Sequence, residues 1–231
     1  MIHCYPGPMA SSKTDRLIDA HGRYPPSQAL AFSPAQNTRE ATIRSRTGRE
    51  IPSIRFERFG DIARRVYESK SHIRACIIDE AHMPARLKGG PEALEALLYM
   101  LAALGIDTFL AYLNIGHHGH EQEPSMLAER LHHDCVISSV SRLKSVCSEH
   151  GSECPEGGAT YSWLIPDLEH AIPGHLRDAE HPDGVYLVVC HSVFWGWMRR
   201  RIEERAALAA RKLLERQRPP QLGLFEVEGM R

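Results

Sequence analysis

Eight residues near the N-terminus, Gly7-Pro8-Met9-Ala10-Ser11-Ser12-Lys13-Thr14, have the length and the Lys-Thr ending of a phosphate-binding loop, or P-loop. In such a loop, backbone N–H groups surround phosphate oxygens at the start of a helix, the lysine meets their charge and the threonine reaches magnesium. One position departs from the motif, because Ser12 stands where glycine permits unusual dihedral angles and close backbone approach. The predicted ATP-binding residues are Gly7, Pro8, Met9, Ser11, Ser12, Lys13 and Thr14.

Two carboxylates, Asp79 and Glu80, directly follow the apolar run 75–78. Open α/β sheets bind ligands at the carboxyl ends of their strands, where an aspartate can hold magnesium through water. A short motif recurs by chance, and the alternative for the loop alone is an accidental Ser-Lys-Thr sequence. Because the two motifs occur together, we interpret them as one site in which Thr14 and Asp79 lie beside Mg²⁺.

Apolar runs and helical patterns alternate along the first half of the chain, which predicts a mostly parallel sheet with helices on its faces. We therefore expect an α/β fold of the P-loop (RecA-like) kind. Strands are expected at 2–5, 29–32, 51–56, 75–78 and 108–113, and helices at 13–20, 59–69 and 91–104. The expected domains are 1–144 for this fold, 145–194 for a small lobe and 195–231 for a helical tail.

Composition limits the classes of function. The chain has 231 residues, 42% hydrophobic and 25% charged, so it can bury a core of ordinary size. A formal net charge of -1 gives no reason to expect a general binder of nucleic acid or membrane. No apolar stretch is long enough to span a bilayer, and we expect a cytoplasmic protein. The six unevenly spaced cysteines favour reduced thiols or a metal site over a secreted disulfide framework.

The order of the motifs resembles the type II thymidine kinases. The family's loop Gly-Pro-Met-x-Ser-Gly-Lys-Ser/Thr is similar to 7–14, and its Lys-Pro-x-x-Asp-Thr-Arg to 33–39. Its Ser-x-x-Gly-x-x-Ile-Pro-Ala is similar to 45–53, and its Asp-Glu-x-Gln-Phe-Phe to 79–84. The similarity runs from about residue 2 to about residue 191, and it leaves the tail outside.

This resemblance implies a transferase for DNA synthesis that phosphorylates the 5'-hydroxyl of thymidine or deoxyuridine, with Glu80 as the base and a homotetrameric assembly. Histidines, His117 and His118, stand where the family has the Phe and Arg of its base-binding loop. The segment Ala159-Thr160-Tyr161-Ser162 resembles Ala-x-Phe-Thr, and Tyr186 begins a match to Tyr-x-x-x-Cys-Arg. The implied substrate-binding residues are His117, His118, Tyr161 and Tyr186.

The resemblance also implies a zinc site in the lobe. The family uses two Cys-x-x-Cys/His pairs, and tetrahedral zinc accepts both thiolate and imidazole ligands. Cys147 and His150 form the first pair, and Cys190 belongs to the second. Because Val193 stands three positions after Cys190, either His191 or Cys154 would complete the set. The alternative is a lobe without metal, whose cysteines pack as small apolar residues.

The tail carries a second functional hypothesis. After two prolines, the segment Gln221-Leu222-Gly223-Leu224-Phe225 resembles the peptide that docks bacterial replication and repair proteins on the sliding clamp. Gln221, Leu222, Leu224 and Phe225 would be its partner-binding residues. The alternative function is then a non-kinase ATP-binding or ATPase module tethered to the clamp in replication, repair or a mobile element, since fold does not fix function.

Overall fold

A computed structural model describes residues 1–37, 42–115, 122–165, 179–181 and 184–217 of the chain. The chain divides into two compact units, Met1–His191 and Ser192–Arg231. All described strands belong to the first unit. The described part of the second unit is helical. Among the described residues, none of the helices combines the length and apolar character needed to cross a lipid bilayer.

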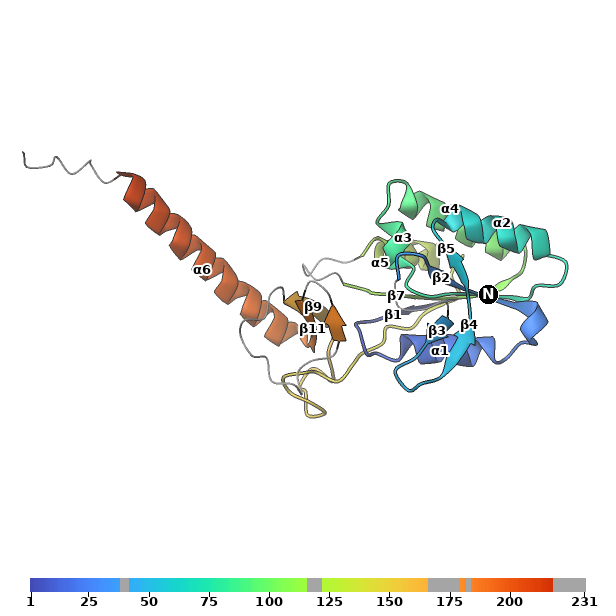
Figure 1. Cartoon of the computed structure of the whole chain (residues 1–231), viewed down its shortest axis with the longest axis horizontal. Coiled ribbons are helices and arrows are strands. Elements are labelled where there is room, and N and C mark those ends of the chain that lie inside the picture. Colours follow the sequence, from blue (N-terminus) through green and yellow to red (C-terminus); the bar gives the residue numbers. More distant parts are fainter. Residues whose placement is uncertain (38–41, 116–121, 166–178, 182–183, 218–231) are drawn as a thin grey trace, which may run out of the picture. The chain divides into compact units, whose positions relative to one another are not determined.

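The core of the first unit is a parallel sheet of six strands (Figure 1). Across the sheet, the strands are β5 (Ile54–Phe56), β2 (Ala29–Pro34), β6 (Ala75–Ile78), β7 (Asp107–Tyr112), β1 (Ile2–Pro6) and β8 (Ser139–Val140). Every pairing between them is parallel. Strand β6 is buried throughout, as expected for a parallel sheet covered on both faces. This confirms the predicted α/β class with a mostly parallel sheet.

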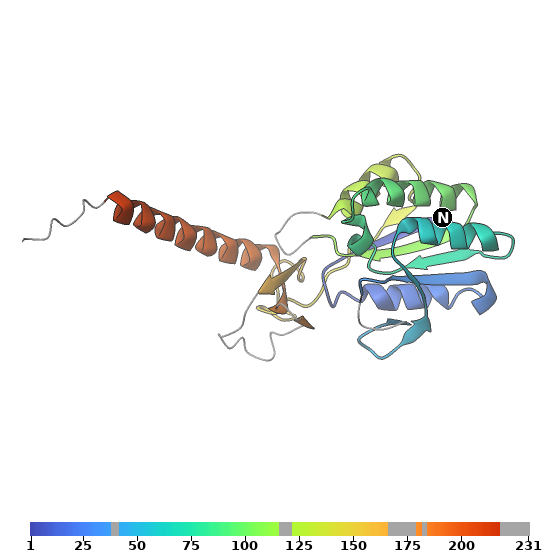
Figure 2. The ribbon, with the colours of Figure 1, turned by 45° about the horizontal axis from the view of Figure 1, so that its top comes forward.

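Helices cover the two faces of the sheet (Figures 1 and 2). Successive residues of a strand face opposite ways, so Cys76 and Ile78 join one buried cluster while Ala75 and Ile77 join another. The first cluster includes side chains of α2 (Phe59–Ser69), α4 (Gly90–Ala103) and α5 (Glu123–His133). The second includes side chains of α1 (Lys13–His21) and of the hairpin formed by β3 (Thr42–Arg44) and β4 (Glu50–Pro52). Two short helices, η1 (Pro26–Gln28) and α3 (His82–Ala85), lie in the connections.

The connections that follow β1 and β7 leave the sheet toward opposite faces. The chain runs from β1 to β2 by way of α1 on one face, and from β7 to β8 by way of α5 on the opposite face. Neighbouring strands β1 and β7 therefore send their chains to opposite faces at their carboxyl ends. Open α/β sheets bind ligands at such a switch point.

A smaller sheet lies in the lobe, which is defined here as residues 145–165, 179–181 and 184–190. Its strands pair antiparallel in the order β10 (Ala179–His181), β11 (Gly184–Val189) and β9 (Tyr161–Ile165). Helix α6 (His191–Gln217) follows, which confirms the helix expected in the tail.

Candidate functional site

The loop between β1 and α1, residues 7–12, is held tightly at its first residue. The Gly7 N–H donates to the Tyr112 carbonyl at 3.2 Å, which ties the loop to the end of β7. A Cβ on Gly7 would lie 2.5 Å from Ser11 Oγ and 3.1 Å from Leu143 Cβ. Ser11 Oγ in turn donates to the Pro8 carbonyl at 2.8 Å. A larger residue at position 7 would therefore have to displace the Ser11 hydroxyl and press on Leu143.

The end of the loop has the backbone of an anion-binding turn. Ser12 has φ 59° and ψ 23°, in the left-handed region, and Lys13 follows as the first residue of α1. Such an alternation of left-handed and helical residues turns successive N–H groups toward one point, and the first turn of a helix leaves its N–H groups without intrahelical acceptors. The Ser12 side chain makes no capping hydrogen bond within the described structure, so these groups are available to an anion.

Lys13 lies under this turn with only 7% of its surface exposed. Its Nζ donates to the Gly7 carbonyl at 3.0 Å and to the Pro8 carbonyl. Burial lowers the pKa of Lys13, the negative charges of Glu80 and Asp79 oppose that change, and the positive charge of Arg46 adds to it. The lysine thus stands in the field of two carboxylates and one guanidinium.

Asp79 and Glu80 follow β6 at the same carboxyl edge of the sheet. The Asp79 N–H donates to the Phe32 carbonyl at 3.0 Å, and the Glu80 N–H donates to Asp79 Oδ1 at 2.9 Å. Burial and the charge of Glu80 raise the pKa of Asp79 to about 7, although Lys13 acts in the opposite direction. Glu80 has φ 49°, an unusual conformation for a residue with a side chain, and such conformations cluster at functional sites.

His82 is a neighbour of Glu80 to which sequence reasoning gave no role. Its side chain is 3% exposed, and its Nδ1 lies 3.3 Å from Glu80 Oε2. The Leu113 N–H, just after β7, donates to the same nitrogen at 3.3 Å. Burial lowers the pKa of His82 to about 4, so the ring is neutral at pH 7 and its contact with Glu80 is no ion pair. His82 therefore links the ends of β6 and β7 beneath Glu80.

The β3–β4 hairpin brings a further cation to the loop. Thr47 Oγ1 donates to Asp15 Oδ1 at 2.9 Å, and Arg49 pairs with Asp19 at 2.6 Å, so the hairpin turn is fixed beside the first turns of α1. Arg46, which lies in that turn, is exposed and contributes positive potential at Lys13. Arg46 is a site residue for which the sequence alone indicated no role.

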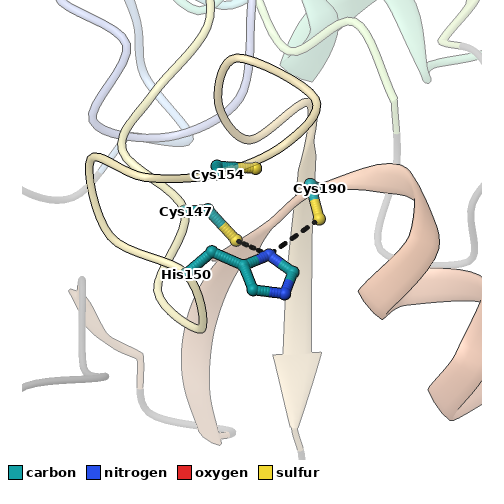
Figure 3. A group of neighbouring side chains, drawn as sticks. All are labelled: Cys147, His150, Cys154 and Cys190. Carbon is teal, nitrogen blue, oxygen red and sulfur yellow. Dashed lines mark hydrogen bonds between the residues drawn. The ribbon is translucent and has the colours of Figure 1, made fainter.

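A second cluster of reactive side chains lies in the lobe (Figure 3). The ligand atoms of its four members all lie within 4.8 Å of one another, and they belong to Cys147, His150, Cys154 and Cys190. His150 Nδ1 is 3.8 Å from Cys147 Sγ and 3.5 Å from Cys190 Sγ. In a tetrahedral zinc site, bonds of about 2.0–2.3 Å place the ligand atoms about 3.3–3.8 Å apart. The donor types and spacing fit a metal ion such as zinc.

The fourth member of this cluster is Cys154, the second of the two alternatives. The prediction that His191 is a ligand was therefore wrong. His191 Nδ1 instead lies 2.8 Å from Tyr161 Oη, and the backbone N–H of His191 donates to Glu156 Oε2. Burial opposes ionisation of Cys154, but hydrogen bonds from the N–H groups of Glu156 and Gly158 and from the His150 and Cys190 side chains lower its pKa to about 7. A thiol that ionises near neutral pH suits metal ligation.

The remaining predicted site residues are placed only in part. Tyr161 is 7% exposed, and of Tyr186 the structure describes the backbone within β11. His117 and His118 lie outside the described residues, as do Gln221, Leu222, Leu224 and Phe225 of the clamp-like peptide. Thr14 is half-buried as the second residue of α1.

All six cysteines are free, in line with the expectation of thiols or a metal site. Neither the protein-family models nor the curated proteins include a match to the chain. Two groups of residues are therefore the candidates for function: those at the carboxyl edge of the large sheet and the cysteine–histidine cluster of the lobe.

Proposed function

We propose that the chain binds ATP with Mg²⁺ at the β1–α1 loop and transfers the γ-phosphoryl group to the 5'-hydroxyl of a deoxynucleoside, as a kinase of thymidine-kinase type. The observation that supports this most is the buried Lys13 at the start of α1, where the negative charges of Asp79 and Glu80, which follow β6, act on its ammonium group. A cation at the start of a helix beside two carboxylates suits a nucleotide phosphate and its metal ion.

Phosphoryl transfer depends mainly on positioning and charge stabilisation, and each residue of the proposed site has its own role in it. The N–H groups at the start of α1 and the ammonium of Lys13 would hold the phosphates. Thr14 and Asp79 would hold Mg²⁺, and the donor set fits because the buried Asp79 carboxylate lacks a full counter-charge. When bound, the metal ion neutralises charge on the phosphates.

Glu80 is the proposed general base. Its side chain is 27% exposed, so a substrate hydroxyl can reach it, whereas Asp79 beside it is nearly buried. As the 5'-oxygen forms its bond to the γ-phosphorus, the bond to the ADP oxygen breaks and the hydroxyl proton passes to Glu80. The neighbouring His82 is neutral at pH 7, because burial lowers its pKa to about 4.

The cysteine–histidine cluster is proposed as a structural zinc site. Its four protein ligands leave no open coordination position for a substrate, which distinguishes structural from catalytic zinc. The kinase proposal has two further parts, both based on the resemblance. One is a homotetrameric assembly, and the other is a substrate site formed by His117, His118, Tyr161 and Tyr186.

The test is transfer of labelled γ-phosphate from ATP to a panel of deoxynucleosides by the purified chain. Lys13→Ala and Glu80→Gln should abolish transfer, and Arg44→Gln is the matched control, since Arg44 pairs with Glu50 on the exposed hairpin. Product that persists in Glu80→Gln would contradict the role of the base. ATP hydrolysis without any nucleoside product would instead favour the ATPase module tethered to the sliding clamp.

A further inference from the structure

Two hydrogen bonds join the β1–α1 loop to the lobe. The Met9 N–H donates to Ser162 Oγ at 2.7 Å, and Ser145 Oγ donates to the Ala10 carbonyl at 3.1 Å. Ser162 is 1% exposed, so its bond to Met9 is shielded from water. The two serines thus hold the peptide groups on either side of the Met9–Ala10 peptide, in the middle of the loop that we assign to phosphate binding.

Both serines lie close to cysteines of the metal-binding cluster. Ser162 in β9 is opposite Val188 in β11, two residues before Cys190. Ser145 lies two residues before Cys147 and exchanges backbone hydrogen bonds of 3.1 and 2.7 Å with Ala159.

Further contacts fix the cluster to the same strands. The Ser148 N–H donates to the Val188 carbonyl at 2.7 Å, and the Thr160 N–H donates to the Val189 carbonyl at 3.1 Å. A metal ion that binds Cys147, Cys154 and Cys190 would therefore join the segment that carries Ser145 to the end of β11, the strand that pairs with Ser162 in β9.

We propose that Ser162 is a positioning residue through which the metal loading of the Cys147–His150–Cys154–Cys190 cluster sets the affinity of the β1–α1 loop for a nucleotide. This inference rests on the proposed function in one respect, the identity of the ligand as a nucleotide. The link between cluster and loop is a property of the structure itself.

The loop needs such support because its backbone is strained. Ala10 has φ 56° and Ser12 has φ 59°, and residues other than glycine keep such angles only where the surroundings enforce them. Without the metal, the segment around Cys147 and β11 are joined by hydrogen bonds such as that from the Ser148 N–H to the Val188 carbonyl, so the lobe holds Ser162 less firmly. The Met9 peptide is then free to turn, and fewer molecules hold the loop in the binding conformation. Apparent affinity falls in proportion to that fraction.

The experiment compares the full chain loaded with Zn²⁺ and the same chain stripped by a chelator, with two readouts. Calorimetry measures the affinity for Mg·ATP, and amide hydrogen exchange follows a peptide that covers residues 7–14. The variants are Ser162→Ala, the conservative Ser162→Thr and the control Ser152→Ala, whose exposed side chain lies in the cluster segment. Zinc content is measured for each variant.

Chelation should weaken binding of Mg·ATP by the wild-type chain and speed exchange in the loop. Loaded Ser162→Ala should keep its zinc, bind Mg·ATP roughly 5- to 30-fold more weakly and respond little to chelation, because the lost buried hydrogen bond is the link. Ser162→Thr should restore affinity, and Ser152→Ala should behave as the wild type.

The outcomes separate the inference from the proposed function. Unchanged loop exchange on chelation and in Ser162→Ala would overturn the link, whether or not the chain binds ATP. If the loaded wild type binds no Mg·ATP while loop exchange responds as expected, the link stands and the nucleotide assignment fails. Equal affinity of loaded and stripped wild type would overturn the inference and leave the proposed ATP site intact.

Discussion

Ser12→Gly should stabilise the protein, because Ser12 occupies a backbone conformation suited to glycine. The left-handed angles φ 59° and ψ 23° cost a residue with a Cβ about 1–2 kcal/mol. Glycine offsets part of that gain by about 0.4–1 kcal/mol, since it loses more conformational entropy on folding. The Ser12 side chain is exposed and makes no capping bond, so little else is lost. The expected net gain is about 0.5–1 kcal/mol.

Urea unfolding of three proteins measures this gain: the wild type, Ser12→Gly and Ser12→Ala. The alanine variant removes the hydroxyl but keeps the Cβ, so its free energy of unfolding should stay close to that of the wild type. The glycine variant should have a higher midpoint at an unchanged slope. A glycine variant less stable than the alanine variant would refute the reasoning, because it would mean that Ser12 does not adopt the left-handed conformation.

Three further perturbations test other parts of the site. Cys154→Ser should lose bound zinc and melt at lower temperature, whereas His191→Ala should keep its zinc; equal metal content by atomic absorption would contradict the ligand set. Burial raises the folded-state pKa of Asp79 from its ordinary value of 3.8 to about 7, so its contribution to stability is full below about pH 4 and lost as pH rises through about 7. Asp79→Asn should remove this fall in the free energy of unfolding between about pH 4 and 7. A difference in that free energy between wild type and variant that stays constant from acid to neutral pH would argue against it. Arg46→Gln should weaken Mg·ATP binding about 3- to 10-fold, most strongly at low salt, while Arg44→Gln should not; equal effects of the two in calorimetry would show that position 46 has no special role.

The central sheet could be predicted from the sequence because its strands are short apolar runs bounded by clear breaks. The run 75–78 is an example, since it is buried at every position. The expected strand 51–56 is instead two strands, β4 and β5, one in the hairpin and one in the central sheet. Pro52 has no N–H to donate, and it ends the first of the two.

Elements of the second half were harder to predict. Helix α5 buries Leu127 and Leu131 at helical spacing, but it follows the histidine-rich stretch 117–120 of the sequence and itself ends in two histidines. Within the described residues, β11 pairs with β9 on one side and with β10 on the other, so the stability of these strands depends on contacts that a local pattern does not reveal.

Some residues of the candidate site could be predicted from the sequence, and others could not. Lys13, Asp79 and Glu80 could be found because parallel strands bring their carboxyl ends to one edge. Ser162 and Arg46 could not, because their roles depend on which surfaces the lobe and the hairpin present to the loop. Cys154 was one of two alternatives, and the choice between it and His191 required the course of the chain between the strands.

The most direct test of the central claim, that the β1–α1 loop is a nucleotide phosphate site, is calorimetric titration of Mg·ATP into the wild-type chain and into Lys13→Ala, at a pH above the pKa of Asp79. We predict one nucleotide bound per wild-type chain and at least a tenfold loss of affinity in Lys13→Ala, because the loss of a buried charge-assisted contact costs more than about 1.4 kcal/mol. No binding by the wild type, or equal binding by both proteins, would contradict the account.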